Sequence, residues 1–102
     1  MSDAIKIEPV GVAQRDLLRN LLQLYLYDFL EFVEVERNTD GLFVYPYLDH
    51  YWTEPDRFPF LISVEGEHIG FALIREELDP LTNEIAYDLA EFFVMRKFRR
   101  KN

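Results

Sequence analysis

Apolar and polar residues alternate over residues 4–9 and then change to a helical spacing. Ile5 and Ile7 alternate with Lys6 and Glu8, which predicts a short strand with one buried face. Over residues 13–35, leucines and aromatic residues recur at intervals of three and four. This spacing predicts a long amphipathic helix packed against one face of a sheet.

The period returns to that of strands in the second half of the chain. Residues 42–52 are rich in aromatic side chains and predict a short second helix after Pro46. Residues 58–64 and 68–75 predict a hairpin, in which Gly66 supplies the positive φ of a two-residue turn. Residues 85–95 are apolar at successive positions, which predicts a central strand covered on both faces. The expected fold is α+β, with a mostly antiparallel sheet of about four strands, and residues 1–102 form a single domain.

The composition excludes several classes of protein. The chain has 102 residues, of which 49% are hydrophobic and 16% aromatic, so it is not an intrinsically disordered chain. It has no apolar run of the ~20 residues that span a bilayer, and no signal peptide, so we expect a cytoplasmic protein without a membrane partner. Without cysteine, and with His50 and His68 away from ligand spacing, no metal site is expected. Ser63 lies inside a strand, which disfavours a covalent acyl-enzyme.

The charge is divided unevenly along the sequence. Residues 1–95 carry six basic and nineteen acidic side chains, a charge of −13, whereas residues 96–102 carry +5, for a total of −8. A basic end on an acidic body indicates an anionic ligand at that end. A solvated basic tail is the simpler alternative. The acidic body argues against a broad nucleic-acid surface.

Two segments resemble the GNAT superfamily of acyl-CoA-dependent N-acetyltransferases. Residues 60–73, with Ile69-Gly70-Phe71-Ala72 after an acid-Gly turn, look like the second and third strands of that family. Residues 90–101 look like its fourth strand entering the cofactor loop. The resemblance implies an α/β GNAT-like fold and acetyl-CoA as the co-substrate.

The chain departs from the family pattern at its end. The family motif is Arg/Gln-x-x-Gly-x-Gly/Ala followed by a helix, and Asn102 stands where the first glycine would be. The following helix, the fifth strand and the usual acid-bearing helix do not follow in this sequence. We therefore expect a truncated, N-terminal part of a GNAT-like domain, and it is left open whether this part is active alone.

The resemblance also implies which residues would bind acetyl-CoA. Backbone groups of the fourth strand would bind the pantetheine arm and the acyl carbonyl, and the basic loop would flank the diphosphate. The implied cofactor-binding residues are Phe92, Phe93, Val94, Arg99, Arg100, Lys101 and Asn102.

Direct transfer from acetyl-CoA to an amine in a ternary complex needs a base that deprotonates the substrate ammonium. Glu91 is the first candidate and Asp88 the alternative. Because they lie three residues apart, they point to opposite faces of a regular strand unless a bulge intervenes.

An aromatic cluster with one carboxylate is suited to an acceptor amine, since aromatic faces attract cations. Its members are Tyr45, Tyr47, Asp49, Tyr51 and Trp52. The alternative is that these residues pack the helical layer onto the sheet. Asp28, Glu31 and Glu34 form an acidic ridge on the first helix, either solvated or attracting amines.

The leading functional hypothesis is therefore an N-acetyltransferase with acetyl-CoA and an unidentified amine as partners. The first alternative is a non-catalytic protein-interaction module on the same half-fold, and a second is an acidic domain tethered by its basic tail to RNA or another anion. We also expect a homodimer through the exposed last strand, in which the basic tail could dock on the acidic ridge of the partner.

Overall fold

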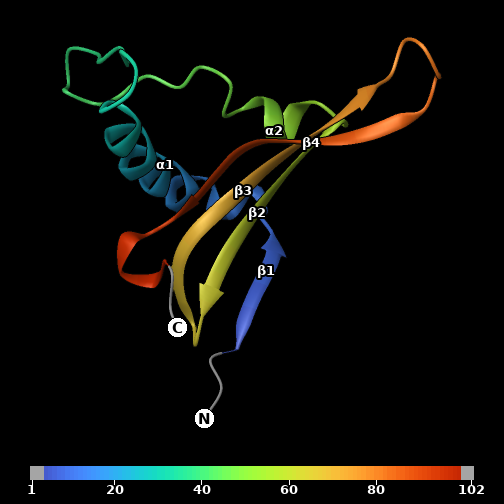
Figure 1. The fold of residues 1–102 in the computed structure, drawn as a ribbon. Coiled ribbons are helices and arrows are strands. Elements are labelled where there is room, and N and C mark those ends of the chain that lie inside the picture. The colour runs from blue at the N-terminus through green and yellow to red at the C-terminus, as the bar shows by residue number, and fades with distance from the viewer. Residues whose placement is uncertain (1–3, 100–102) are drawn as a thin grey trace.

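The structure is a computed structural model that describes residues 4–99. Its strands form one four-stranded sheet in which each strand pairs antiparallel with the next along the chain (Figure 1). The strands are β1 (Ile5–Pro9), β2 (Arg57–Val64), β3 (Glu67–Leu78) and β4 (Ile85–Val94). The predicted α+β class, with four antiparallel strands and two helices, is confirmed.

The β2–β3 hairpin forms where the sequence predicts it. Its two-residue turn has positive φ at both positions, 50° at Glu65 and 82° at Gly66. Glycine takes this backbone conformation without a steric penalty, and the turn matches the twist of the flanking strands.

The first helix is shorter than the sequence predicts. A 3-10 turn, η1 (Val12–Gln14), leads into α1 (Arg15–Phe29), so the predicted extent of residues 13–35 is wrong at its C-terminal end. Residues 31–36 place three glutamates where the negative end of the helix dipole disfavours acids, and two valines with low helix propensity. Phe32, which continues the apolar spacing, is 76% exposed.

The core lies between α1 and one face of the sheet. The buried side of α1 consists of leucines that pack in one cluster with Phe71, Leu73 and Phe93 of β3 and β4. The short helix α2 (His50–Thr53) adds Tyr51 to the same cluster. The buried leucines of α1 are Leu18, Leu21, Leu22 and Leu26.

The opposite face of the sheet is largely open among the residues described. Leu89 and Phe92 of β4 are 55% and 52% exposed, and Ile7 of β1 is 61% exposed. Phe93 is the buried position of β4. The expectation that this strand is covered on both faces is therefore wrong for residues 4–99, since the helical layer covers the side that carries Phe93.

Gly70 allows β3 and β4 to approach closely at the end of the sheet. A Cβ atom at this position would lie 2.1 Å from the carbonyl oxygen of Phe93 and 3.0 Å from the Cα atom of Val94. These are backbone atoms, which cannot rotate aside as a side chain can. Gly70 therefore fixes how β4 passes the end of β3.

We predict that Gly70→Ala lowers the free energy of unfolding by about 2 kcal/mol or more, because the new methyl group must displace backbone. Urea unfolding followed by circular dichroism measures the change. Gly11→Ala is the matched control, since a Cβ there meets nothing within 4 Å and its φ is −76°. Equal stability of the two variants would contradict the close approach.

Candidate active site

A β-bulge in β4 brings the two candidate carboxylates to the same face of the sheet. Leu73 pairs with Glu91, but Ile74 pairs with Leu89, so Ala90 is the extra residue. Beyond the bulge, Asp88 lies opposite Arg75. In a regular strand the two carboxylates would be on opposite faces. The bulge left open by the sequence is present, and both side chains line one cavity.

The Glu91 carboxylate is bound by two tyrosine hydroxyls from distant parts of the chain. The hydroxyl of Tyr25, on α1, donates to Oε1, and that of Tyr45, before α2, donates to Oε2 at 3.2 Å. Burial first, and then the Glu91 carboxylate, raise the pKa of both tyrosines well above the usual value. Both hydroxyls therefore keep their protons and remain donors.

Asp88 has a different environment from Glu91. Arg75 pairs with Asp88 at 2.9 Å and also with Glu77 at 3.1 Å. Within residues 4–99, Glu91 forms no ion pair, and its oxygens accept hydrogen bonds from neutral tyrosines. The charge of Asp88 is thus compensated by an arginine, whereas that of Glu91 is not.

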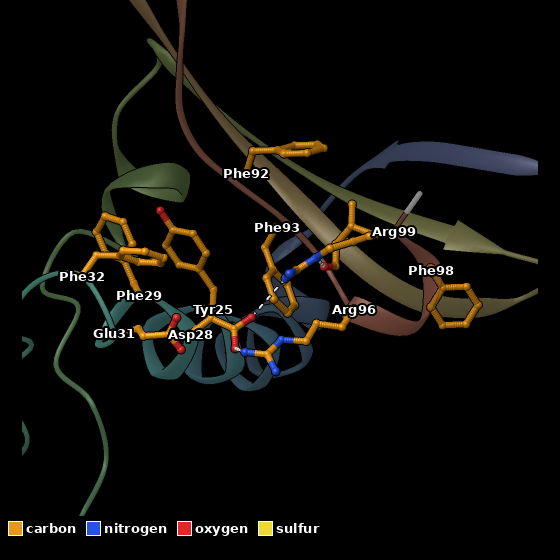
Figure 2. Close-up of a pocket in the computed structure, with 11 residues that line it drawn as sticks. Tyr25, Asp28, Phe29, Glu31, Phe32, Phe92, Phe93, Arg96, Phe98 and Arg99 are labelled. Atoms are coloured by element: carbon orange, nitrogen blue, oxygen red, sulfur yellow. Dashed lines mark hydrogen bonds and ion pairs between the residues drawn. The ribbon is translucent and has the colours of Figure 1, made fainter. Parts of the chain in front are cut away.

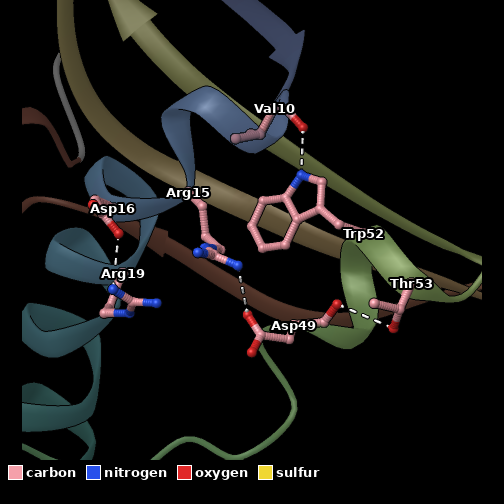
Figure 3. Close-up of polar contacts among 7 residues, drawn as sticks. All are labelled: Val10, Arg15, Asp16, Arg19, Asp49, Trp52 and Thr53. Atoms are coloured by element: carbon pink, nitrogen blue, oxygen red, sulfur yellow. Dashed lines mark hydrogen bonds and ion pairs between the residues drawn. The ribbon is translucent and has the colours of Figure 1, made fainter.

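The predicted aromatic cluster divides into two groups. Tyr45, Tyr47 and Tyr51 line a cavity of about 400 Å³ together with Glu91 and Asp88, which we call the tyrosine cavity. Trp52 and Asp49 do not line it. The indole Nε1 of Trp52 donates to the carbonyl of Val10 at 2.9 Å, and Asp49 pairs with Arg15 at 3.3 Å (Figure 3). The packing alternative therefore describes Trp52 and Asp49 better than the amine pocket does.

A second cavity, of about 600 Å³, lies between α1 and the end of β4 (Figure 2). We call it the arginine cavity, and its lining includes Tyr25, Asp28, Phe92, Phe93, Val94, Arg96 and Arg99. The structure thus brings together four of the predicted cofactor residues: Phe92, Phe93, Val94 and Arg99. The other three, Arg100, Lys101 and Asn102, lie outside the described residues.

The arginines of this cavity are held by their own chain. Asp28 lies between them and accepts hydrogen bonds from Arg96 at 2.9 Å and Arg99 at 3.0 Å (Figure 2). Arg99 also donates through Nε to the carbonyl of Val94, and its guanidinium lies 5.5 Å from the centre of the Phe93 ring. The basic segment therefore docks on the acidic ridge within one chain.

Sequence reasoning missed two residues of this region, Tyr25 and Asp28. Tyr25 lies among the leucines and aromatic residues that predict the helix, and a tyrosine in such a stripe carries a hydroxyl that needs a partner. Asp28 was assigned to the ridge with Glu31 and Glu34. The uneven charge of the chain was the available signal for its pairing with the arginines.

Residues 4–99 contain neither a candidate metal-binding cluster nor a candidate membrane-spanning helix. No group of three or more His, Asp or Glu side chains in this range could hold a metal ion. No helix described by the structure is long and apolar enough to cross a membrane.

Comparison with known proteins gives a match at the level of structure. No protein-family profile and no curated protein sequence matches the chain. The fold is similar to the crystal structure of ribosomal-protein-alanine N-acetyltransferase from Brucella melitensis biovar Abortus 2308, with a TM-score of 0.68 and 19% identity. The match covers 96% of this chain and 62% of that one. The chain therefore has the fold of a GNAT-type N-acetyltransferase over the part that the two share.

Proposed function

We propose that this chain takes part in acetyl-CoA-dependent transfer of an acetyl group to an amine, with Glu91 as the proton acceptor. One observation carries the proposal: Glu91 is bound at once by Tyr25, which lines the arginine cavity, and by Tyr45, which lines the tyrosine cavity. A residue that accepts a proton during transfer between two substrates is expected where the two substrate cavities meet. The fold shared with an N-acetyltransferase supports the same conclusion.

The arginine cavity suits acetyl-CoA in its chemistry. The strand residues Phe92, Phe93 and Val94 line it for an uncharged arm, with the Phe93 side chain on the α1 face, while Arg96 and Arg99 offer charge to phosphates. The acetyl donor would be held here, with its thioester toward Tyr25. Arg99 must release Asp28 or the carbonyl of Val94 to bind a phosphate, because these groups share its donors.

The tyrosine cavity suits the amine. An ammonium group that enters it meets the Glu91 carboxylate, whose charge is uncompensated, and transfers a proton to it. The free amine attacks the acetyl carbonyl, a C–N bond forms and the C–S bond breaks. The protonated Glu91 passes its proton through the Tyr25 hydroxyl to the leaving thiolate, and the second proton that the nitrogen loses as the amide forms is released to solvent.

A second candidate is a protein-interaction module, and the open face of the sheet favours it. Ile7, Leu89 and Phe92 expose more than half of their surface on that face. Exposed apolar patches of this kind mark association sites in other proteins. Sedimentation of the chain at micromolar concentration distinguishes a monomer from the homodimer that this face would form.

Acetyl-CoA binding tests the first candidate, since it does not require that the chain catalyse turnover. We predict that acetyl-CoA binds and that Arg99→Ala weakens binding about threefold or more. Asp28→Asn should tighten it about threefold, because it frees two arginines from a competing carboxylate. Titration calorimetry at about 50 mM and about 300 mM salt measures both changes, which should shrink at high salt.

Arg19→Ala is the matched control for these titrations. Arg19 is an exposed arginine of α1, the helix that carries Asp28. It pairs with Asp16 and lines no part of the arginine cavity. Arg19→Ala removes the same charge as Arg99→Ala and should leave acetyl-CoA binding unchanged. The proposal fails if acetyl-CoA does not bind, or if Arg19 and Arg99 matter equally.

The tyrosines of the site should make the fold sensitive to alkali. In the folded chain, Tyr25 and Tyr45 keep their protons above pH 10, where an unfolded tyrosine loses its proton. Their contribution to the free energy of unfolding is therefore complete below about pH 10 and is lost as the pH rises further. We predict that the free energy of unfolding falls less steeply between about pH 9 and about pH 11.5 in Tyr25→Phe/Tyr45→Phe than in the wild type.

Urea unfolding followed by circular dichroism across this pH range measures the slope. Tyr27→Phe is the control, because its side chain is 64% exposed and does not contact Glu91. An unchanged slope in the double variant would show that the two hydroxyls do not stay protonated at the site.

A further inference from the structure

The face of the sheet that points away from α1 is apolar along its whole length. Residues that pair across antiparallel strands share a face, so Ile7, Ile62 and Val94 lie together on this outward face. Among its paired positions, only Glu67 and Glu76 carry a charge. An antiparallel sheet whose outer face meets water normally carries polar residues there. The outward face therefore has the composition of a surface that is covered.

One end of the outward face belongs to an arm that projects from the sheet. Beyond Arg75, which pairs with the first residue of β2, β3 and β4 continue alone as residues 76–87 (orange in Figure 1). Outward side chains of the arm include Leu78, Ile85 and Tyr87, which are 60%, 58% and 69% exposed. The arm has no basic side chain, and its acidic ones are Glu76, Glu77, Asp79 and Glu84.

The other end of the outward face is a groove with basic residues beside it. This base groove, of about 650 Å³, is lined mainly by apolar side chains from all four strands and by Phe98. The Nζ of Lys97 lies 5.5 Å from the centre of the Phe98 ring, and Lys97 forms no ion pair within residues 4–99. Glu65 and Glu67 lie at the β2–β3 turn, so an acidic segment would enter the groove from the side of Lys97.

The arm and the base groove complement each other when a second copy faces the first. A two-fold axis that is parallel to the sheet and perpendicular to its strands places the arm of each copy over the base groove of the other. Apolar side chains then meet apolar side chains, and the acids of the arm lie beside Lys97. An axis along the strands would instead bring the two acidic arms together, which their like charges oppose.

The outward face is also large enough for a stable pair. A large side chain that is more than half exposed presents on the order of 100 Å². Two copies that cover six such side chains each would bury about 1,200 Å², which is the size of a specific interface. The six that are at least 55% exposed are Ile5, Ile7, Leu78, Ile85, Tyr87 and Leu89.

We propose that this chain forms a two-fold homodimer through the outward face of its sheet, with the arm of each copy in the base groove of the other. The inference is separate from acyl transfer, and it gives a definite geometry to the association that the second candidate function leaves open. It differs from pairing of two β4 edges, because edge pairing would leave the outward face exposed.

Tyr87→Lys and Ala86→Lys test the face that is used. The two positions are adjacent and exposed on the arm, and both variants add one positive charge, but Ala86 pairs with Glu77 on the opposite face. We expect Tyr87→Lys to weaken dimerisation about tenfold or more and Ala86→Lys to change it less than about twofold. Sedimentation equilibrium measures both constants, and circular dichroism confirms that both variants fold. Equal effects would indicate edge pairing and overturn the proposal.

A charge swap tests the position of the arm. Glu84→Lys and Lys97→Glu should each weaken dimerisation about threefold at low salt, and the two changes combined should restore it. Glu84→Lys makes the net charge of −8 less negative, which reduces general repulsion between copies, so weaker association would report a lost specific contact. Glu8→Lys is the control, since it makes the same charge change on the opposite face of β1, opposite Leu61. The proposal fails if Glu8→Lys weakens association as much, or if the combined variant is not restored.

Cross-linking tests the geometry directly, because the chain has no cysteine of its own. A copy with Leu81→Cys, at the tip of the arm, should be joined by a short bis-maleimide to a copy with Lys97→Cys. Two Leu81→Cys copies should not be joined, since the ten residues of β4 separate tip from base by about 30 Å. Cross-links between two tips would overturn the proposal.

The result is independent of acetyl-CoA binding. None of the substituted residues lines the arginine cavity. A chain that sediments as a monomer at about 100 μM overturns the homodimer, and acetyl-CoA binding that still depends on Arg99 would leave the proposed function standing. A dimer that follows these substitutions without binding acetyl-CoA would retain this inference and overturn acyl transfer.

Discussion

The bulge at Ala90 is the constraint on which the site depends. It shifts the register between β3 and β4 by one residue, so that Asp88 faces Arg75 while Glu91 faces the helical layer with Leu73. Without it, a single carboxylate could face α1. Gly70 acts at the other end of the same strand pair, where it lets the backbone of Phe93 approach within a distance that no side chain allows. The bulge and the glycine together fix the course of β4 past α1.

The two carboxylates then differ through their neighbours rather than their positions. Arg75 compensates Asp88, so removing a proton from a ligand by Asp88 would break an existing ion pair. Glu91 is held by Tyr25 and Tyr45, which are neutral and remain protonated because their burial and the adjacent charge oppose ionisation. Neutral donors orient a carboxylate without cancelling its charge, which leaves it able to attract an ammonium group and to accept its proton.

The sequence predicts the sheet better than it predicts the site. The hairpin follows from alternation around Glu65 and Gly66, and the start of α1 from its leucine spacing, because these are local properties. The sequence predicts too late an end for α1, because apolar spacing continues to Phe32, which is exposed beyond the helix end at Phe29. The bulge could not be predicted, since Ala90 has no feature that marks it as the extra residue. Which aromatic residues line the cavity depends on long-range contacts, such as that of Trp52 with Val10.

Asp28 shows how charge separated along a chain can be used within the fold. The sequence suggested that the basic end serves an anion, and the structure supplies one from α1 in the form of the Asp28 carboxylate. Its side chain is 25% exposed, so the two ion pairs are partly shielded from solvent and compete with a phosphate for the same donors. An external dianion can displace a monoanionic carboxylate, because it offers more charge and more acceptor oxygens to two guanidinium groups. Asp28 would then keep the arginines ordered before binding and set the affinity that a phosphate must exceed.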